Sequence, residues 1–366
     1  MRPRWGLALV VLVALVAALL YALTRGGAGP QRSPEFGADM GVLFQDHDPP
    51  AVVNRALASA AAAGLGVARV APLWELTEPT PPQGGHHRYD WRYDDFIARE
   101  LAGHGFRWVA VLAFAPAWAS VQPGVLHSAP RVTAAYAAYA AAVARRYRGL
   151  ISAFEVWNEE DLPVFWRPAP DPVAYARLYE AARAAIHRVD PGVPVLVGGL
   201  AGGHTRFLTD LLQQPLLRGR MDGLAIHTYA ATPARMLAQI RAYRLRLTGA
   251  SFGAVPLYVT EYGWSSRPIA RSPKGFPVPA GSYAPPSVRP GFIVQAARDV
   301  LASGCNVRMA VFYAWVTPQR TPVTLYQWYG VAAPDGAGTP ASRAISREAG
   351  LTRVRAAPAG SCLPQG

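Results

Sequence analysis

Two glutamates in this sequence each close a short apolar run, where a buried β-strand would end. Glu159 ends the run over residues 154–159, and Glu261 ends the run over residues 257–261. In parallel β/α barrels, chemistry gathers at the carboxyl ends of the strands. Two carboxyl groups about 5 Å apart can cleave a glycosidic bond, because one attacks the anomeric carbon while the other protonates the leaving oxygen. The two glutamates are therefore a candidate catalytic pair.

The rest of the chain predicts the elements that would position this pair. Short apolar runs alternate with helix-length amphipathic stretches from Phe36 onward, which is the pattern of a parallel β/α architecture. The chain has 366 residues, which is enough for a (β/α)8 TIM barrel of roughly 250 residues. The expected strands cover 36-44, 66-73, 107-114, 151-157, 193-199, 221-227, 256-261 and 307-315. The expected helices cover 51-63, 90-103, 131-148, 171-189, 204-217, 232-247, 290-303 and 340-348.

Helix start signals support these predicted helix boundaries. Asp171 precedes Pro172, and Thr232 precedes Pro233, so that each pair places a capping residue before a proline in the first helical turn. The longest irregular stretch, residues 266–290, contains seven prolines and follows the seventh expected strand. A loop of that length on a compact fold is usually functional, so we expect it on the catalytic face.

Strands four and seven lie on opposite sides of such a barrel, so Glu159 and Glu261 can converge across its mouth. We expect Glu159 to be the acid, with a pKa raised by apolar surroundings and by the charge of Glu261. The alternative is a pair of structural carboxylates bound to arginines. Glu155 and Glu160 compete for the acid role, but strand alternation places Glu155 deeper on the same face, where a hydrogen-bonded core role is favoured.

These motifs resemble clan A, the retaining TIM-barrel glycosidases with catalytic glutamates on strands four and seven. In that clan the acid/base follows an asparagine, as in Asn158-Glu159, and the nucleophile ends strand seven, as Glu261 does. The resemblance implies that Asn158 bonds the sugar 2-hydroxyl. It also implies which residues hold the nucleophile and form the floor of the subsite for the sugar being cleaved: Arg69, His227, Tyr229 and Trp315.

Within the clan, residues 74–79, 89–91 and 155–166 look most like glycoside hydrolase family 39, whose bacterial members include an exopolysaccharide endoglycosidase. The segment 329–336 also fits, and the resemblance covers most of 36–350. Family 39 also includes xylosidases and iduronidases, and family 5 shares the catalytic frame. The resemblance implies hydrolysis of an extracellular poly- or oligosaccharide by double displacement. Transglycosylation and noncatalytic polysaccharide binding are the alternatives.

Tryptophans near the expected strand ends are candidate sugar platforms, because aromatic faces suit the apolar faces of sugar rings. Trp118, Trp264 and Trp315 are the predicted substrate-binding tryptophans, and Trp315 is the foremost of them. Packing in the core is the alternative for each, since large aromatic residues are often mostly buried.

The N-terminus predicts export. Residues 6–24 form an almost uninterrupted apolar run that follows Arg2 and Arg4 and precedes Arg25. The length of the run favours an uncleaved signal anchor over a cleaved signal peptide. We expect an exported protein, secreted or anchored to the outer side of the cytoplasmic membrane. The expected organisation is a signal segment over 1-25, a linker over 26-35, the catalytic domain over 36-350 and a tail over 351-366.

Composition and charge exclude several classes of protein. Hydrophobic residues make up 51% of the chain and charged residues 16%, which excludes a disordered chain. The net charge of +13 either attracts an anionic polysaccharide or bilayer or reflects scattered solvated arginines, since Lys274 is the only lysine. No phosphate loop, dinucleotide fingerprint or RNA- or DNA-binding motif occurs, so neither a cofactor nor nucleic acid is expected.

The histidine pair and the two cysteines do not predict further chemistry. His86 and His87 have no carboxylate or cysteine at ligand spacing, so no metal site is predicted there. Cys305 and Cys362 are the only two cysteines. In an exported chain they either pair or remain a buried thiol and a tail thiol, and neither state is catalytic.

Overall fold

The computed structural model describes residues 35–45, 48–201, 206–269, 272, 281–319, 326–349 and 362. The chain divides into two compact units, Met1–Ser33 and Pro34–Gly366. The predicted signal segment and most of the predicted linker lie outside the described residues, and so does much of the proline-rich loop over 266–290. None of the helices within the described ranges combines the length and the apolar character needed to span a membrane.

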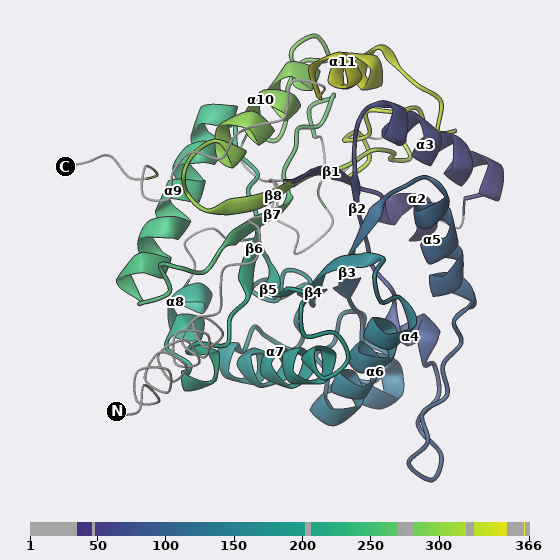
Figure 1. The fold of residues 1–366 in the computed structure, drawn as a ribbon, viewed down its shortest axis with the longest axis vertical. Helices are drawn as coiled ribbons and strands as arrows, with labels where there is room; N and C mark the ends of the chain where they lie inside the picture. Colours follow the sequence, from purple (N-terminus) through teal and green to yellow (C-terminus); the bar gives the residue numbers. More distant parts are fainter. Residues whose placement is uncertain are drawn as a thin grey trace, which may run out of the picture. The chain divides into compact units, whose positions relative to one another are not determined.

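The second unit is a closed barrel of eight parallel strands, in the order β1 to β8, with helices around it (Figure 1). The strands are β1 (Glu35–Asp39), β2 (Val67–Val70), β3 (Arg107–Leu112), β4 (Ile151–Val156), β5 (Val195–Leu200), β6 (Gly223–His227), β7 (Leu257–Glu261) and β8 (Val307–Phe312). All eight predicted strands are present, so the predicted (β/α)8 TIM barrel is confirmed.

The helices follow the predicted alternation. They are α2 (Gly41–Gln45), α3 (Pro50–Ala62), α4 (Trp74–Thr77), α5 (Arg92–Gly103), α6 (Thr133–Arg146), α7 (Pro172–His187), α8 (Arg206–Leu212), α9 (Pro233–Gly249), α10 (Arg289–Leu301) and α11 (Pro340–Ala349). Two 3-10 turns, Ala117–Ala119 and Pro215–Leu217, complete the described set. The predicted helix over 204-217 is shorter than expected, since α8 ends at Leu212.

The predicted helix caps are present. The Asp171 side chain accepts hydrogen bonds from the amides of Val173 and Ala174 at the start of α7. The Thr232 hydroxyl accepts one from the amide of Arg235 at the start of α9. Each cap satisfies amides that have no partner within the helix, which fixes where the helix begins.

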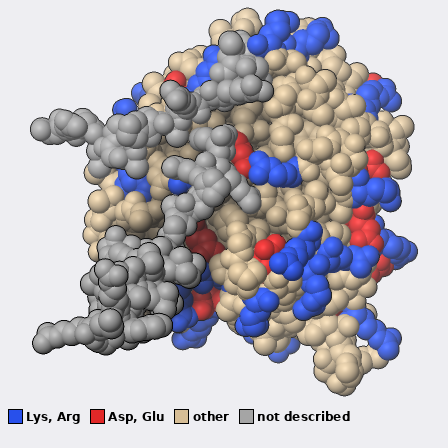
Figure 2. All heavy atoms as spheres, in the orientation of Figure 1, with Lys and Arg blue, Asp and Glu red and all other residues tan. Residues whose placement is uncertain are grey.

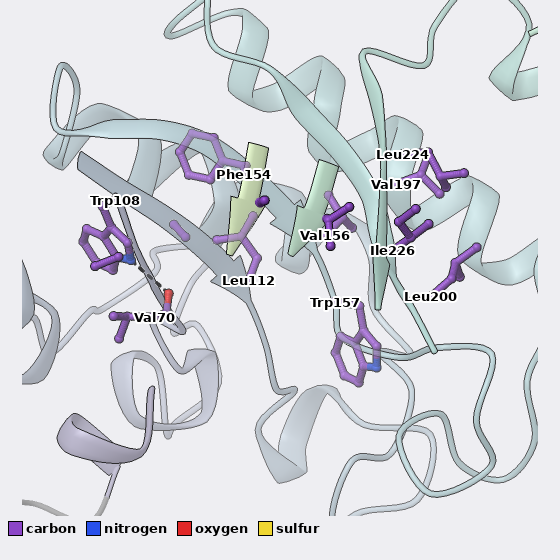
Figure 3. Packing of buried hydrophobic residues seen from close by; sticks show 14 of the residues in the cluster. Val70, Trp108, Leu112, Phe154, Val156, Trp157, Val197, Leu200, Leu224 and Ile226 are labelled. Atoms are coloured by element: carbon purple, nitrogen blue, oxygen red, sulfur yellow. Dashed lines mark hydrogen bonds between the residues drawn. The ribbon is translucent and has the colours of Figure 1, made fainter. Parts of the chain in front are cut away.

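An apolar layer between the strands and the helices forms most of the core. Outward-facing strand residues such as Leu112, Phe154 and Ile226 pack in this layer (Figure 3). Trp108 of β3 belongs to it and donates its Nε1–H to the carbonyl of Val70 at 2.9 Å (Figure 3). Burial of the indole therefore leaves its one polar group satisfied.

A second, smaller apolar cluster fills the barrel itself. Its members alternate with the outward-facing residues along the strands, as the pleat requires. They are Val67, Val109, Ala153, Leu196, Ala225, Tyr258, Met309 and Val311. Two residues further along several of these strands the interior becomes polar, and this polar layer carries the candidate site.

The C-terminal tail is tied to the barrel. Cys305, which follows α10, forms a disulfide with Cys362. Of the two alternatives that the sequence left open, the structure has the paired one.

Basic side chains are spread over the surface. On the face drawn in Figure 2, arginines form several separate groups, some with acidic side chains beside them. The described atoms of this face do not form one continuous basic patch, which agrees with the scattered alternative.

Candidate active site

The loop that follows β4 brings Glu159 to the mouth of the barrel. Trp157 and Glu159 both have positive φ, 72° and 50°, which non-glycine residues rarely adopt. The amide of Glu159 donates to the carbonyl of Gly199 on the neighbouring β5 at 3.2 Å. The main chain at Glu159 is therefore held in an unusual conformation by its neighbouring strand.

Glu261 ends β7 on the other side of the mouth. The Tyr229 hydroxyl donates to Glu261 Oε2 at 2.7 Å, and Arg69 Nη1 donates to Glu261 Oε1 at 2.6 Å. One carboxylate oxygen of Glu159 and one of Glu261 lie within 4.8 Å of each other. The pair predicted from the sequence thus meets in space, with both side chains largely buried.

Arg69 connects most of the polar layer. Its Nη1 donates to Asp39 Oδ2 at 2.8 Å as well as to Glu261, and its Nε donates to Glu155 Oε2 at 3.4 Å. Its Nη2 donates to Glu155 Oε1 at 2.6 Å and to Asn158 Oδ1 at 2.7 Å. A guanidinium has five N–H donors, so every donor of Arg69 is engaged within the protein.

Asn158 is oriented by the same arginine. Because its Oδ1 accepts from Arg69, its amide NH2 points away from the guanidinium, and Asn158 also lines the cavity described below. This orientation agrees with a donor that faces a sugar hydroxyl, the role that the sequence resemblance implied for Asn158.

His227, at the end of β6, lies between three carboxylates. Its Nδ1 is 2.8 Å from Glu159 Oε1 and 3.6 Å from Glu261 Oε2, and its Nε2 is 3.8 Å from Glu155 Oε1. Burial lowers the pKa of His227, but the charge of Glu261 and the hydrogen bonds to Glu155 and Glu159 outweigh burial and raise the pKa to about 10. At neutral pH the ring is therefore a cation that donates from Nδ1 to Glu159.

The carboxyl groups of the layer differ in protonation. Burial would raise the pKa of Glu155, but the charge of Arg69 prevails and lowers it to about 2, so that Glu155 is ionised. Burial raises the pKa of Glu159, His227 opposes this, and the charges of Glu261 and Asp161 add to the rise. The direction for Glu159 is the one expected of an acid. Glu155 has the hydrogen-bonded interior position predicted for it.

Glu160, the other competitor for the acid role, does not reach the site. It is completely buried, and it packs against Gly198, where an added Cβ would lie 1.9 Å from Glu160 Oε1. Burial raises its pKa well above the ordinary value. Glu160 therefore lies beside β5, outside the described lining of the cavity, and is not placed to give a proton to a substrate.

In the polar layer β5 contributes only main chain at Gly199, whereas the neighbouring strands β4 and β6 contribute the side chains of Glu155 and His227. A Cβ on Gly199 would lie 2.3 Å from His227 Nε2 and 2.6 Å from Glu155 Oε1. Contacts that short are not tolerated, so the polar layer requires glycine at this position.

Glu159, His227 and Glu261 form a group whose ligand-type atoms could surround a metal ion. A metal requires a neutral imidazole, however, and the pKa of His227 is raised to about 10 by its carboxylate neighbours. The proton on the ring, donated to Glu159, suits a hydrogen-bonded charge network better than metal ligation.

A cavity of about 220 Å³ opens above the polar layer. Arg69, Asn158, Glu159 and Glu261, all predicted from the sequence, line it. Further lining residues were not predicted from the sequence: Asp39, Gln45, Phe114, His127, Phe165, Tyr313 and Tyr326. Asp39 could have been found, because it is a polar residue that ends the apolar run of β1. The others lie on loops or beyond strand ends and gave no comparable signal.

Burial contradicts two of the three predicted tryptophan platforms, Trp315 and Trp264. Trp315 is completely buried, and its Nε1 donates to Ser59 of α3 at 3.0 Å, so no sugar can contact it. Trp264 is 1% exposed and packs edge-on against Phe292. Trp118 is half-buried, donates to the carbonyl of Glu78, and does not belong to the described lining of the cavity.

Comparison with known proteins adds to this geometry. No family model matches the chain. A stretch of 135 residues, 32% of the chain, is 31% identical to a beta-xylosidase from Geobacillus stearothermophilus. The match spans only 27% of that relative's length.

Solved structures share the fold over most of the chain. A GH39 enzyme from Xanthomonas axonopodis pv. citri has a TM-score of 0.67 and 20% identity, with 90% of this chain and 68% of that chain covered. A GH39 beta-xylosidase from Caulobacter crescentus has a TM-score of 0.64 and 20% identity, with 88% and 72% covered. A family 39 glycoside hydrolase from Bacteroides cellulosilyticus has a TM-score of 0.68 and 17% identity, with 88% and 64% covered. The chain thus has the (β/α)8 TIM-barrel fold of these glycoside hydrolases, and a stretch of it is similar in sequence to a beta-xylosidase.

Proposed function

We propose that this protein is a retaining glycoside hydrolase with Glu261 as nucleophile and Glu159 as acid/base. The observation that carries the proposal is the approach of the two carboxylates, whose oxygens lie within 4.8 Å across the mouth of the barrel. Retaining enzymes hold their carboxyl groups about 5 to 5.5 Å apart, whereas inverting enzymes leave a wider gap for a water molecule. The likeness to a beta-xylosidase and to GH39 structures also supports a glycosidase.

In the first step Glu261 attacks the anomeric carbon. Arg69 and Tyr229 each donate a hydrogen bond to a different oxygen of Glu261, which fixes the orientation of its carboxylate. Glu159 gives its proton to the leaving glycosidic oxygen, so the bond from that oxygen to the anomeric carbon breaks as the bond to Glu261 forms.

In the second step Glu159 acts as the base. Once Glu261 is an ester it has lost the negative charge that raises the pKa of Glu159, while His227 still favours the ionised carboxylate. The pKa of Glu159 therefore falls, and the carboxylate takes a proton from water as the water attacks the anomeric carbon. The sugar is released with its original configuration.

We further propose an extracellular poly- or oligosaccharide as substrate and an exported enzyme, secreted or anchored through residues 1–25. The Cys305–Cys362 disulfide supports export, because such bonds persist mainly in oxidising compartments. Fractionation of the native source with an antibody to the protein tests this. Detection only in the cytosol, with both thiols free, would contradict export.

The activity is tested with the full-length protein in detergent, assayed for sugar release from a panel of polysaccharides and nitrophenyl glycosides. Glu159→Gln and Glu261→Gln are run beside Glu100→Gln, a change of the same type on the outer helix α5. We expect release by the parent and by Glu100→Gln, and none by the other two. Proton NMR of early product should show the retained anomer.

Other outcomes point elsewhere. The opposite anomer would contradict double displacement, and sugar binding without turnover by the parent would favour a noncatalytic polysaccharide-binding protein.

A further inference from the structure

His127 enters the cavity from a loop that the proposed mechanism does not use. It lies between the 3-10 turn Ala117–Ala119 and α6, and it lines the same cavity as Glu159 and Glu261. Its φ of 57° is in the left-handed region, which a histidine rarely adopts. Strained backbone persists where the surrounding structure fixes it, and such residues cluster at ligand sites.

The imidazole of His127 is held by aromatic rings. Its centroid lies 4.8 Å from that of Phe165 in a stacked arrangement and 4.2 Å from that of Phe114 in a tilted one. The loop that carries His127 and the loop that carries Phe165 are joined by main-chain hydrogen bonds. Arg167 N donates to the carbonyl of His127, and Ala129 N donates to the carbonyl of Arg167. His127 is therefore a fixed part of the cavity wall.

The hydrogen bond of His127 determines which ring nitrogen is an acceptor. Nδ1 is 3.0 Å from the carbonyl of Val164, and a carbonyl can only accept, so Nδ1 carries the proton. Burial lowers the pKa of His127, which keeps the ring neutral near pH 7. Nε2 is then an acceptor, and within the described part of the chain no hydrogen bond to Nε2 is present.

The charged groups of the cavity also favour a ligand that donates to them. Asp39, Glu159 and Glu261 present carboxyl oxygens, and all five donors of Arg69 already bind protein groups. No unengaged cation lies among the described lining residues. A sugar carboxylate or sulfate would therefore meet like charges and no free cation among the described lining residues, whereas neutral hydroxyl groups can donate to these carboxyl oxygens.

The size of the cavity identifies which sugar meets His127. Its volume is about 220 Å³, below the roughly 300 Å³ at which pockets for drug-sized ligands begin. Both proposed catalytic glutamates and His127 line this one space. We therefore infer that the sugar next to His127 is the one whose anomeric carbon reacts.

We propose that His127 is a specificity-determining residue whose Nε2 accepts a hydrogen bond from a hydroxyl of a neutral sugar, the one whose glycosidic bond is cleaved. The proposal rests on the proposed function. It assigns the recognition of one hydroxyl to a loop residue, and the charges of the described lining favour a neutral sugar over a uronic acid or a sulfated sugar at the reacting position.

Two substitutions separate this role from a structural one. His127→Asn keeps a donor at the Nδ1 position for Val164, and asparagine tolerates positive φ, but it removes the acceptor at the Nε2 position. His127→Gln does the reverse, since its amide reaches the Nε2 position and abandons Val164. If Nε2 of His127 recognises the sugar, His127→Gln should keep more activity than His127→Asn. If His127 only supports its loop through Val164, His127→Asn should keep more.

The assay is kcat/KM of the full-length protein on the nitrophenyl glycoside it cleaves best and on the monodeoxy analogues of that glycoside. We expect His127→Asn to lose about tenfold or more on the parent glycoside and His127→Gln to lose much less. On the one analogue that lacks the recognised hydroxyl, parent and His127→Asn should become equal. Equal losses by His127→Asn on every analogue would overturn the proposal, as would a fully active His127→Asn. Comparable cleavage of the matching uronide would overturn the restriction to neutral sugars.

Failure of the proposed function is distinguishable from failure of this inference. If the parent cleaves no glycoside, calorimetric titration of the same sugars measures recognition alone. The inference then stands if His127→Asn binds about tenfold more weakly than His127→Gln, and it falls if the two bind equally or if the parent binds no sugar.

Discussion

The barrel interior contains two layers, built by the same strands two residues apart, that differ completely in chemistry. Val67, Ala153 and Ala225 belong to an apolar cluster. Two positions later, on the same faces of β2, β4 and β6, stand Arg69, Glu155 and His227, and these carry charge. Both layers are almost fully buried.

The difference shows how each layer is stabilised. Apolar contacts have no preferred direction, so the apolar layer requires mainly volume. In the polar layer each charge offsets the burial cost of another, and removing one group leaves the others uncompensated. We therefore expect the two layers to respond very differently to changes of similar size, and three experiments test this, the largest effect first.

Arg69→Met should produce the largest effect. The variant keeps the length of the side chain but leaves Asp39, Glu155 and Glu261 without their shared cation. Breaking a buried ion pair by removing one partner costs about 3–5 kcal/mol, and the nucleophile also loses a hydrogen bond. We expect a destabilisation of this size in urea unfolding. We also expect activity to fall by at least about two orders of magnitude.

Met309→Leu is the matched change in the apolar layer. Met309 of β8 is 3% exposed and belongs to the apolar cluster of the barrel interior. A volume-conserving swap of this kind usually costs less than about 1.5 kcal/mol. If Met309→Leu destabilises the protein as much as Arg69→Met, the contrast between the layers is wrong.

Tyr229→Phe should produce an intermediate effect on turnover. It removes the hydroxyl that donates to Glu261 Oε2 at 2.7 Å and leaves the ring in place. A hydrogen bond to a charged group contributes about 1.5–3 kcal/mol, so we expect kcat to fall about tenfold to a hundredfold. Steady-state kinetics on a nitrophenyl glycoside measures this.

Tyr262→Phe serves as the control for that change. Tyr262 follows Glu261 directly, but its hydroxyl donates outward, to the carbonyl of Ile293 in α10 at 2.8 Å. This variant should lose some stability and almost no kcat. Equal losses of kcat in both variants would mean that the hydroxyl of Tyr229 has no special effect on Glu261.

The smallest effect is the pH dependence that His227 gives to stability. Its pKa is raised from 6.5 to about 10 in the folded protein, so above pH 6.5 the folded state binds more protons than the unfolded state. The stabilisation from His227 is fully present below pH 6.5 and is lost as the pH rises through about 10. Between about pH 7 and 8 this single group should lower the free energy of unfolding by about 1 kcal/mol.

Urea unfolding of the parent and of His227→Gln at these two pH values measures that contribution. The parent should lose more stability than the variant over the interval. If both have the same pH slope, His227 is not protonated in the folded protein.

Sequence patterns predicted the barrel because the signals of its strands and of its helices are both local in the sequence. The alternation of strand and helix, the caps at Asp171 and Thr232, and the polar residues that end apolar runs are all visible within a few positions. The same signal found Glu159 and Glu261, whereas Arg69 was implied by the family resemblance. Strand alternation also placed Glu155 correctly, because its partner Arg69 lies on the same interior face.

The aromatic lining was not predictable in this way. Whether a ring beyond a strand end faces the cavity depends on the path of the loop, and that path is set by contacts distant in sequence. Tyr313 lines the cavity, whereas Trp315, two residues later, is buried against α3. His127 reaches the cavity only because its loop pairs with Arg167, 40 residues away in the chain.

The bare backbone of β5 at Gly199 limits how this barrel can acquire new specificities. Any side chain at Gly199 would collide with His227 and Glu155, so that position offers no route to a changed substrate preference. Residues over β1, β3 and β8, among them Gln45, Phe114 and Tyr313, face the cavity without belonging to the charged network. Libraries that vary these three positions and leave β5 untouched should yield altered sugar preference in folded protein, whereas libraries that include Gly199 should yield mostly insoluble variants.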